Sequence, residues 1–389
     1  MMRLAAPLTL VSLVAGACGF DGTAAIDATS DMVPIAGPCP AYATVLRDCL
    51  ISTAATPPVL VGSRVYNTDT HVLADLQGGG NPATPSFIDA MTDSGPITAL
   101  VVPSLSFSST WRLRVVGSRP FAIVSPGAIT IAGSLDAASG GAGTRATAEA
   151  CGTSIGSDGA TNSQNIGGGA GGGGGGFGSV GGAGGGGDKN GTPTLGGAGG
   201  GKADLPTGVV GGCAGGKGAT GPGLGGIGGA GGGAVYLASD VSILVSGVIN
   251  VGGAGGNRGE FQSGGGGGGG AGGMILLEAP MLRVTGVLAA NGGGGGGGAG
   301  GSGVQLATAG LAGMPNVTAA SGGIGGAGDG GGGAGGSGGF LSAEDGATTA
   351  AANAGGGGGG GGVGYIVVMM KTALDVDGAE ITPALTIAP

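Results

Sequence analysis

The sequence predicts an all-β protein: a right-handed parallel β-helix, or β-solenoid, from which glycine-rich, polyproline-II-like segments extend. Three observations predict it. Apolar residues alternate with a period of two, and no stretch has helical periodicity. A short pattern of strand, glycine and strand recurs along the chain. Finally, 107 of the 389 residues are glycine and only 9% are charged, so most of the chain cannot form an ordinary globular core.

The recurring pattern marks the turns of the predicted coil. It reads ITIAGSL at 129–135, ILVSGVI at 243–249 and LRVTGVL at 282–288, with a looser copy, LDVDG, at 374–378. Each turn of a coil of stacked strands buries a few such aliphatic residues toward its axis. A β-sandwich of tight hairpins is the competing structure. It fits less well, because no Asn-Gly or Asp-Gly turn separates the two strands in the first three copies.

The first seventeen residues have the features of an export signal. A positive start, Met1-Met2-Arg3, precedes a mostly apolar run at 4–14 and the small residues Ala15-Gly16-Ala17. This run is too short to span a bilayer as a helix. We therefore expect residues 1–17 to be a signal peptide that is removed from the mature protein.

The next residue resembles the lipobox cysteine of bacterial lipoproteins. Cys18 directly follows the small residues and precedes Gly19-Phe20-Asp21, although Ala15 stands where that family usually has a large aliphatic residue. In the family this cysteine is lipidated and becomes the new N-terminus. The resemblance implies an exported protein anchored by lipid in the outer membrane or at the cell surface, with plain secretion as the alternative. Residues 18–56 would then be a tether that carries a small disulfide loop.

Four further cysteines predict disulfide bonds. Cys39, Cys49, Cys151 and Cys213 are an even number in a chain expected to be exported, and three pairings are possible. Proximity favours Cys39 with Cys49, which leaves Cys151 with Cys213 to join two glycine-rich stretches. A metal site fits the spacing poorly, because the chain has no CxxC motif and its only histidine is His71.

Residues 57–139 predict the N-terminal turns, or a cap, of the coil. Short strands are expected at 59–61, 65–66 and 71–73. After a break at 78–82, apolar and polar residues alternate between corners of Ser, Gly and Pro. The residues expected to face the core are Leu105, Phe107, Trp111, Leu113, Val115, Phe121, Ile123, Ile129, Ile131, Leu135 and Ala137.

Residues 140–362 form a glycine-rich body with 93 glycines. Its three excursions, 140–233, 252–273 and 292–362, lie between copies of the recurring pattern, so we expect each to leave and rejoin one coil. Residues 363–389 then supply the last strands or a cap. Ordering one glycine costs roughly 1–2 kcal/mol of backbone entropy. The runs therefore either stay mobile as linkers, or pack side by side in polyproline-II-like form and bond through their backbones.

These features together resemble the glycine-rich surface lipoproteins and adhesin-like β-solenoid proteins of bacteria, of the myxobacterial predicted-lipoprotein type. The residues that carry the resemblance are the stretches 59–70 and 113–120 and the four copies of the recurring pattern. The glycine runs are also similar to those of mycobacterial glycine-rich repeat proteins and of the receptor-kinase glycine-rich domain, and neither similarity extends beyond the runs. The resemblance implies a surface location rather than an activity.

Motifs for nucleotide or nucleic-acid binding are missing or follow from the glycine content. Many GxGxxG matches occur, but no predicted helix completes a dinucleotide site, and no GxxxxGK[ST] is present. No nucleotide cofactor is therefore expected. A net charge of −9 without a basic cluster argues against nucleic acid.

Candidate catalytic and calcium residues are isolated. GxSxG occurs around Ser154 and Ser337, but a hydrolase would need His71 as the partner of either serine. A calcium-binding repeat needs successive GGxGxD copies, and the one similar stretch, GGAGD, ends at Asp329 and is not repeated nine residues later. The acids at 344–345 and at 375 and 377 are expected at solvated turns or outward strand positions.

The sequence therefore predicts a non-enzymatic structural or adhesive protein without cofactor or metal. Its membrane contact would be the lipid on Cys18, and its expected partner is extracellular matrix or polysaccharide. A polysaccharide-active enzyme on a parallel β-helix and a passive spacer with disordered glycine runs are the alternatives. The scarcity of charged residues argues against the enzyme, because sugar cleavage needs paired carboxylates in a cleft.

Overall fold

The computed structural model describes residues 35–53, 62–76, 82–161, 167–189, 192–260, 262–301, 306–327, 330–349 and 353–388. They belong to one compact unit that comprises residues 34–389. The expected signal peptide, Cys18, the strand expected at 59–61 and Asp329 lie outside the described residues.

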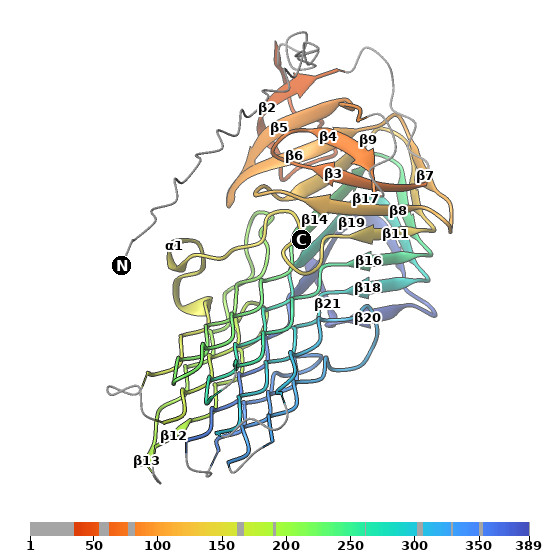
Figure 1. Ribbon diagram of the computed structural model, residues 1–389. Coiled ribbons are helices and arrows are strands. Elements are labelled where there is room, and N and C mark those ends of the chain that lie inside the picture. The colour runs from red at the N-terminus through yellow and green to blue at the C-terminus, as the bar shows by residue number, and fades with distance from the viewer. Residues whose placement is uncertain are drawn as a thin grey trace, which may run out of the picture. The chain divides into compact units, whose positions relative to one another are not determined.

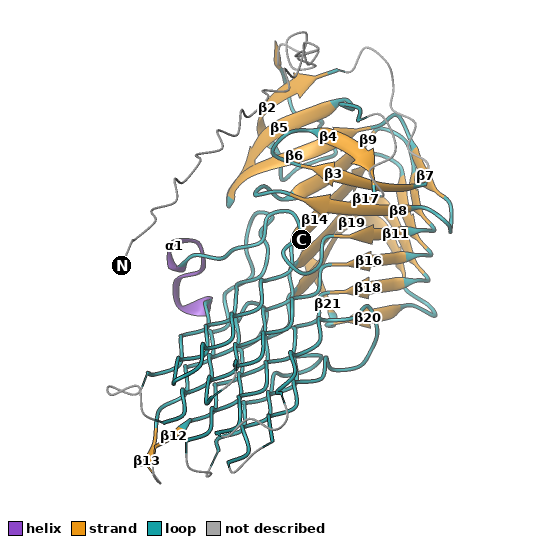
Figure 2. Ribbon diagram, in the orientation of Figure 1, coloured by secondary structure: helices purple, strands orange, loops and turns teal. Residues whose placement is uncertain are grey.

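β-Strands are the main regular structure (Figure 2). The strands before the first glycine-rich stretch are β1 (Ile35–Ala36), β2 (Arg47–Ser52), β3 (Ser63–Asn67), β4 (Val72–Asp75), β5 (Phe87–Thr92), β6 (Gly95–Val101), β7 (Leu105–Phe107), β8 (Arg112–Val116), β9 (Phe121–Ser125), β10 (Ile129–Ile131) and β11 (Ser134–Asp136). The later strands are β12 (Asp188–Lys189), β13 (Thr192–Pro193), β14 (Ala234–Ser239), β15 (Ser242–Val245), β16 (Val248–Asn250), β17 (Met274–Val284), β18 (Val287–Ala289), β19 (Tyr365–Asp375), β20 (Glu380–Thr382) and β21 (Leu385–Ala388). The helical part of the described chain is one α-turn, α1 (Ala148–Cys151), and the 3₁₀ turn η1 (Gly152–Ser154). The all-β prediction is thus confirmed.

Most strands stack in parallel into three ladders (Figure 1). The first ladder contains β6, β9, β14, β17, β19 and β21. The second contains β7, β10, β15 and the C-terminal halves of the long strands β17 and β19. The third contains β3, β8, β11, β16, β18 and β20. The chain passes through the three ladders in turn and then starts the next layer.

The copies of the recurring pattern lie directly on one another. Ile129 pairs with Ile243, and Ile243 with Leu282 in the next layer. Leu282 pairs with Leu374 of the loosest copy. The period-two pattern therefore places equivalent aliphatic residues in continuous columns, as the sequence predicts.

The corner glycine of the pattern is required by this stacking. A Cβ atom on Gly247 would overlap the carbonyl oxygen of Gly133 in the layer before, and one on Gly286 would overlap that of Gly247. The same carbonyl of Gly133 accepts a hydrogen bond of 2.9 Å from the N–H of Val248. A side chain at the corner would thus separate the layers and break the bond that joins them.

The inward side chains form one hydrophobic core along the stack. All eleven residues expected to face the core between Leu105 and Ala137 are buried, which confirms the alternation. Burying one large aliphatic or aromatic side chain contributes roughly 1.5–3 kcal/mol, so the columns offset much of the backbone entropy lost in the strands.

The prediction of a uniformly parallel coil is wrong at the N-terminal end, because the sheets are mixed. β1, β2, β5 and β6 pair antiparallel in succession, and β3 pairs antiparallel with β4. A tight turn between Thr92 and Gly95 connects β5 to β6. Gly95 has φ of +122°, a conformation that L-residues rarely adopt, so this glycine permits the hairpin. Alternating apolar residues alone do not distinguish such a hairpin from a parallel layer.

The three glycine-rich excursions leave the stack at one corner. In the first layer, β8 and β9 are joined by the short connection Gly117–Pro120. In the following layers the equivalent connections run through 140–233, 252–273 and 292–364. Each excursion thus joins the end of the third ladder to the start of the first.

Inside the excursions, extended segments lie side by side and bond through their backbones (Figures 1 and 2). In segment 264–273, the successive N–H groups of Gly265, Gly266 and Gly267 donate to three different neighbours, at 3.0, 2.9 and 2.8 Å. The next three N–H groups return to the same three neighbours in the same order. The backbone therefore repeats every three residues, which is the period of a polyproline II helix.

The same segment also accepts bonds from three further segments, 167–177, 223–232 and 292–299, and so has six neighbours. Four central segments have six neighbours each: 167–177, 264–273, 292–299 and 355–362. Ten outer segments surround them, and each bonds to the next in a closed ring: 179–188, 195–201, 154–160, 213–219, 223–232, 251–260, 306–313, 320–326, 332–339 and 344–349. We call these fourteen segments the glycine bundle. Six neighbours around each central segment is hexagonal packing.

The central segments are long glycine runs, because hexagonal packing leaves little space for side chains there. The exceptions within them are Ala170, Phe177, Ala271 and Ala299. Cβ atoms on Gly266, Gly267 and Gly268 would overlap backbone carbonyl oxygens of three different neighbours. In glycine a Cα–H group faces each of these oxygens instead, which is the geometry of a weak Cα–H···O contact. This packing gives the backbone N–H and C=O groups hydrogen-bond partners within the protein. In a flexible linker of the same composition, these groups would bond to water instead.

Candidate interaction surface

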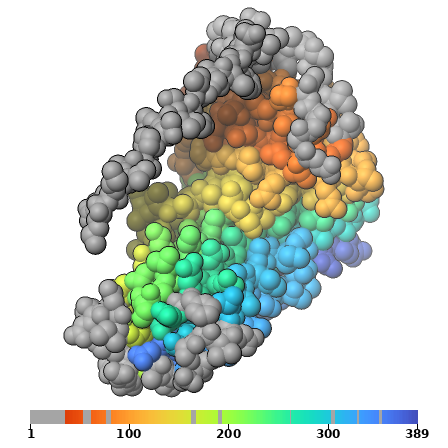
Figure 3. All heavy atoms as spheres, in the orientation of Figure 1, coloured from red at the N-terminus to blue at the C-terminus, as the bar shows by residue number. Residues whose placement is uncertain are grey.

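The outer ring of the glycine bundle displays side chains on its outward positions. On segment 223–232 these are Leu224, Ile227 and Ala230, three residues apart, because the glycines between them face other segments. Leu224 and Ile227 are 62% and 61% exposed. Other exposed apolar residues of the ring are Val180, Leu195, Leu306, Leu311 and Ile324. The surface is therefore repetitive, rich in small and apolar groups, and poor in charge. Figure 3 shows the green to blue atoms of the later part of the chain packed against one another below the orange N-terminal strands.

Two disulfide bonds occur, Cys39–Cys49 and Cys151–Cys213. They are the pairs that proximity in the sequence favours. The first closes a loop at the N-terminal end of the described chain, over the outer side of the first ladder. The second joins α1 to segment 213–219 of the outer ring, between residues 62 positions apart in the sequence. The two bonds therefore hold separate parts of the fold.

The disulfide loop is held to the sheet by a buried carboxylate. Glu278 lies on β17 and is 5% exposed. Its two carboxylate oxygens accept bonds from the backbone N–H of Thr44 at 3.1 Å and from the Thr44 hydroxyl at 2.6 Å. The Tyr236 hydroxyl donates a third bond. Burial, and then the charge of Glu278, raise the pKa of Tyr236, so this phenol remains a donor at neutral pH. These three hydrogen bonds therefore have a structural role: they fix the disulfide loop on the sheet.

A second polar cluster surrounds Asp89 on β5. Its carboxylate accepts from the Thr98 hydroxyl at 2.6 Å, lies 3.1 Å from His71 Nε2 and pairs with Arg119 at 2.9 Å. The His71 ring stacks on Phe87 with 3.8 Å between ring centroids. Burial alone would raise the pKa of Asp89, but the bonds from His71, Thr98 and Arg119 outweigh it and lower the pKa to about 2.

This shift predicts a loss of stability in acid. A carboxylate with a depressed pKa stabilises the fold fully above its unfolded pKa of 3.8, and the contribution is lost as the pH falls to about 2. After allowance for solvent screening, Asp89→Asn is expected to lower the free energy of unfolding by about 1 kcal/mol at pH 7. Urea unfolding at several pH values measures it, and the difference from wild type should vanish below about pH 2.

Asp93→Asn is the matched control for that experiment. Asp93 pairs with Arg47 at 3.1 Å, but both side chains are well exposed. An exposed pair contributes only about 0.5 kcal/mol or less, so this variant should change little at any pH. Equal losses in the two variants would contradict the account of Asp89.

The structure does not bring the candidate hydrolase residues together. Ser154 is buried in η1, and its carbonyl oxygen accepts from the N–H of Gly176. Ser337 lies on the outer ring segment 332–339. No hydrogen bond among the described residues joins His71 to either serine. His71 is engaged with Asp89 instead.

The remaining acids named in the sequence have structural contacts. Asp345 accepts from the N–H of Ala183 at 2.7 Å and so braces two ring segments. Glu344 is exposed on the same outer segment. Asp375 pairs with Arg283 at 3.1 Å on adjacent layers, and Asp377 follows it in a turn. All four acids are exposed, as expected for turns and outward positions.

The described residues contain no group of three or more His, Cys, Asp or Glu side chains arranged to hold a metal ion. No helix in the described ranges has the length and apolar character needed to cross a bilayer.

Sequence reasoning missed the polar residues Glu278 and Arg145. Glu278 has a local signal, since it is an acid inside the otherwise apolar run MILLEAP at 274–280. Arg145 has none, because it stands alone among small residues and one of its two partners, Gly211, is 66 residues away in the sequence. Comparison of the chain with protein-family profiles, with curated proteins and with solved structures finds no match.

Proposed function

We propose that the protein is a non-enzymatic structural or adhesive lipoprotein of the cell surface, which presents the outer ring of the glycine bundle to extracellular matrix or polysaccharide. In this proposal the three ladders form a right-handed parallel β-helix, and the bundle segments are polyproline II helices inserted at one corner of it. The protein is exported and held by a lipid on Cys18, like the surface lipoproteins that the sequence resembles.

The observation that carries the proposal is the closed outer ring around four central segments that consist almost entirely of glycine. On segment 223–232 such packing places the side chains on the outside, three residues apart. One repeated row, Leu224 and Ile227, is more than half exposed. A periodic surface complements a partner that is itself periodic, such as a polymer, and contiguous exposed apolar groups commonly mark interaction sites.

Adhesion is tested with the purified mature protein and the matrix fraction of the producing cells. Leu224→Ser with Ile227→Ser is expected to reduce co-sedimentation with matrix by about fivefold or more, because truncating interface anchors often costs over 1 kcal/mol each. Met281→Ser is the control, since Met281 is 49% exposed on β17, outside the bundle. Equal retention of all three proteins would refute adhesion through the outer ring.

Anchoring is tested separately by fractionation with lipid labelling. Wild-type protein should carry the label and sediment with membranes, whereas Cys18→Ser should be unlabelled and soluble. An unlabelled wild type would favour plain secretion and leave the adhesion result unaffected.

The passive spacer is distinguished by hydrogen exchange. The amide groups of Gly264–Gly270 and Gly355–Gly362 donate to neighbouring segments at 2.8–3.3 Å. We expect slow exchange in both runs, because opening them requires separating six neighbours. Uniformly fast exchange would favour the spacer and contradict the ordered surface.

A further inference from the structure

A cavity of about 790 Å³ lies where the strand stack, α1 and the glycine bundle meet. Its walls come from the stack at Pro96 and Pro120, from the stretch 143–150, from the bundle at Phe177, and from the connection 203–210 between two outer segments. Most of these walls are apolar, and hydroxyl groups of Ser94, Ser118 and Thr147 are spaced among them. The cavity is large enough to hold a small organic molecule.

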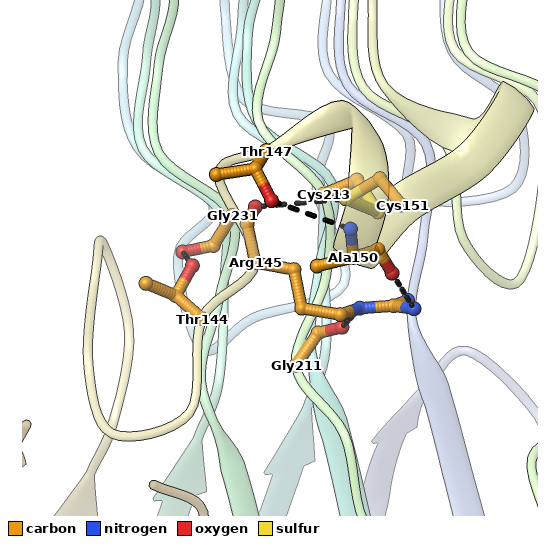
Figure 4. The surroundings of a disulfide bond; sticks show 8 residues. All are labelled: Thr144, Arg145, Thr147, Ala150, Cys151, Gly211, Cys213 and Gly231. Carbon is orange, nitrogen blue, oxygen red and sulfur yellow. Dashed lines mark hydrogen bonds between the residues drawn. A yellow bond between two sulfur atoms is a disulfide. The ribbon is translucent and has the colours of Figure 1, made fainter. Parts of the chain in front are cut away.

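One cation lines this cavity, the guanidinium group of Arg145 (Figure 4). Nε donates to the carbonyl oxygen of Gly211 at 2.7 Å, and Nη1 donates to that of Ala150 at 3.1 Å. The group also lies over the Phe177 ring, 4.9 Å from its centroid. Nη2 is buried and has no hydrogen-bond partner among the described residues.

Arg145 also has no ion pair with any carboxylate that the structure describes. Burial lowers the pKa of its guanidinium group, which reflects the cost of holding this charge away from water. Burying a cation without a counter-ion is costly, and an anion in the adjoining cavity recovers part of that free energy through its charge. The fold therefore places a cation without a counter-ion at the wall of a largely apolar cavity.

The Cys151–Cys213 disulfide holds this guanidinium group in place (Figure 4). Ala150 precedes Cys151, and its carbonyl anchors Nη1. On the other side, the backbone N–H of Arg145 donates to Gly212 at 3.1 Å, and the N–H of Ala214 donates to the Arg145 carbonyl at 3.1 Å. Both neighbours of Cys213 thus bind the Arg145 backbone, and the side chain is oriented before any ligand arrives.

We propose that this cavity binds a small organic monoanion, a carboxylate with an apolar body, whose charged group pairs with Arg145. The apolar body packs on Leu205, Pro206 and Val210, which line the cavity and are not fully buried. Asp204 also lines the cavity and is exposed at its rim. Its negative charge disfavours ligands with a second anionic group, so a monocarboxylate fits better than a dianion.

The test compares two probes of nearly equal shape, 1-naphthoate and the neutral 1-naphthamide, by calorimetric titration of the mature protein. Wild type should bind naphthoate at least about tenfold more tightly than naphthamide, the factor that one charge-assisted pair supplies. Arg145→Gln should remove this preference and keep the weak binding of naphthamide. Retained naphthamide binding also shows that the variant is folded.

Two further variants keep the proposal falsifiable. Asp204→Asn removes an exposed charge, so folding should be unaffected and naphthoate should bind about two- to threefold more tightly, with naphthamide unchanged. Arg112→Gln is the control, because Arg112 is exposed on β8 outside the cavity. Equal affinity of wild type for the two probes, or binding of neither at about 1 mM, would overturn the proposal.

Discussion

Replacing Gly268 by alanine is expected to lower the free energy of unfolding by about 3 kcal/mol or more. The new methyl group would overlap the carbonyl oxygen of Gly173. That oxygen cannot move aside cheaply, because it already accepts from the N–H of Gly216 at 2.8 Å. Separating the segments would also stretch the bond from Gly268 to Gly216, which is 2.9 Å long. Urea unfolding gives the stability, and hydrogen exchange over 264–273 shows whether the bundle loosens.

Gly331→Ala is the matched control for this substitution. Gly331 also lies in the glycine-rich body, but it is exposed, and the nearest atom to an added Cβ is 4.0 Å away. The same chemical change should therefore alter stability by no more than about 0.5 kcal/mol, or raise it slightly by restricting the unfolded chain. Similar losses at both positions would show that helix or strand propensity, rather than the hexagonal packing, governs these glycines.

Removing the Cys151–Cys213 bond is expected to lower the free energy of unfolding by about 4 kcal/mol, and removing Cys39–Cys49 by about 3 kcal/mol. The loss is larger for the first pair because it closes 62 residues of chain, against 10 for the second, and so restricts the unfolded state more. The bond also holds α1 against the outer ring. Double serine variants of each pair, compared by urea unfolding, measure both losses.

The order of the two losses is the informative result. If the Cys39–Cys49 variant loses more, local packing of the N-terminal loop on the sheet outweighs chain entropy. Thr44→Val is a useful companion, since it removes one hydroxyl bond to Glu278 and leaves both disulfides intact. We expect it to cost about 1 kcal/mol, much less than either disulfide.

Where side chains repeat, the fold follows from the sequence. The stacked aliphatic residues Ile129, Ile243 and Leu282 belong to a pattern that recurs in the amino-acid sequence. The corner glycine is part of each copy of that pattern. The N-terminal hairpin between β5 and β6 escaped prediction because its alternation is the same as that of a parallel layer. Only the strand with which each strand pairs differs, and this pairing is determined by the tertiary structure.

The polar sites are harder to predict than the strands. The hydrogen-bond and ion-pair partners of Asp89 are His71, Thr98 and Arg119, and these residues lie on different strands and turns. The Arg145 cavity combines the stack, α1 and the bundle, and no motif in the sequence relates these parts. The exposed row at Leu224 and Ile227 does have a signal, a period of three within a glycine tract, which the period-two and helical patterns do not detect.

The sequence by itself determined the all-β class, the columns of aliphatic residues, the places where the excursions leave the stack and the favoured cysteine pairs. Each of these depends on side chains whose size or spacing is visible locally. Only the tertiary structure decided that the glycine runs have six neighbours each and which run lies next to which. A glycine residue carries no side chain to mark its partner, so its place is set by backbone bonds to segments far away in the chain.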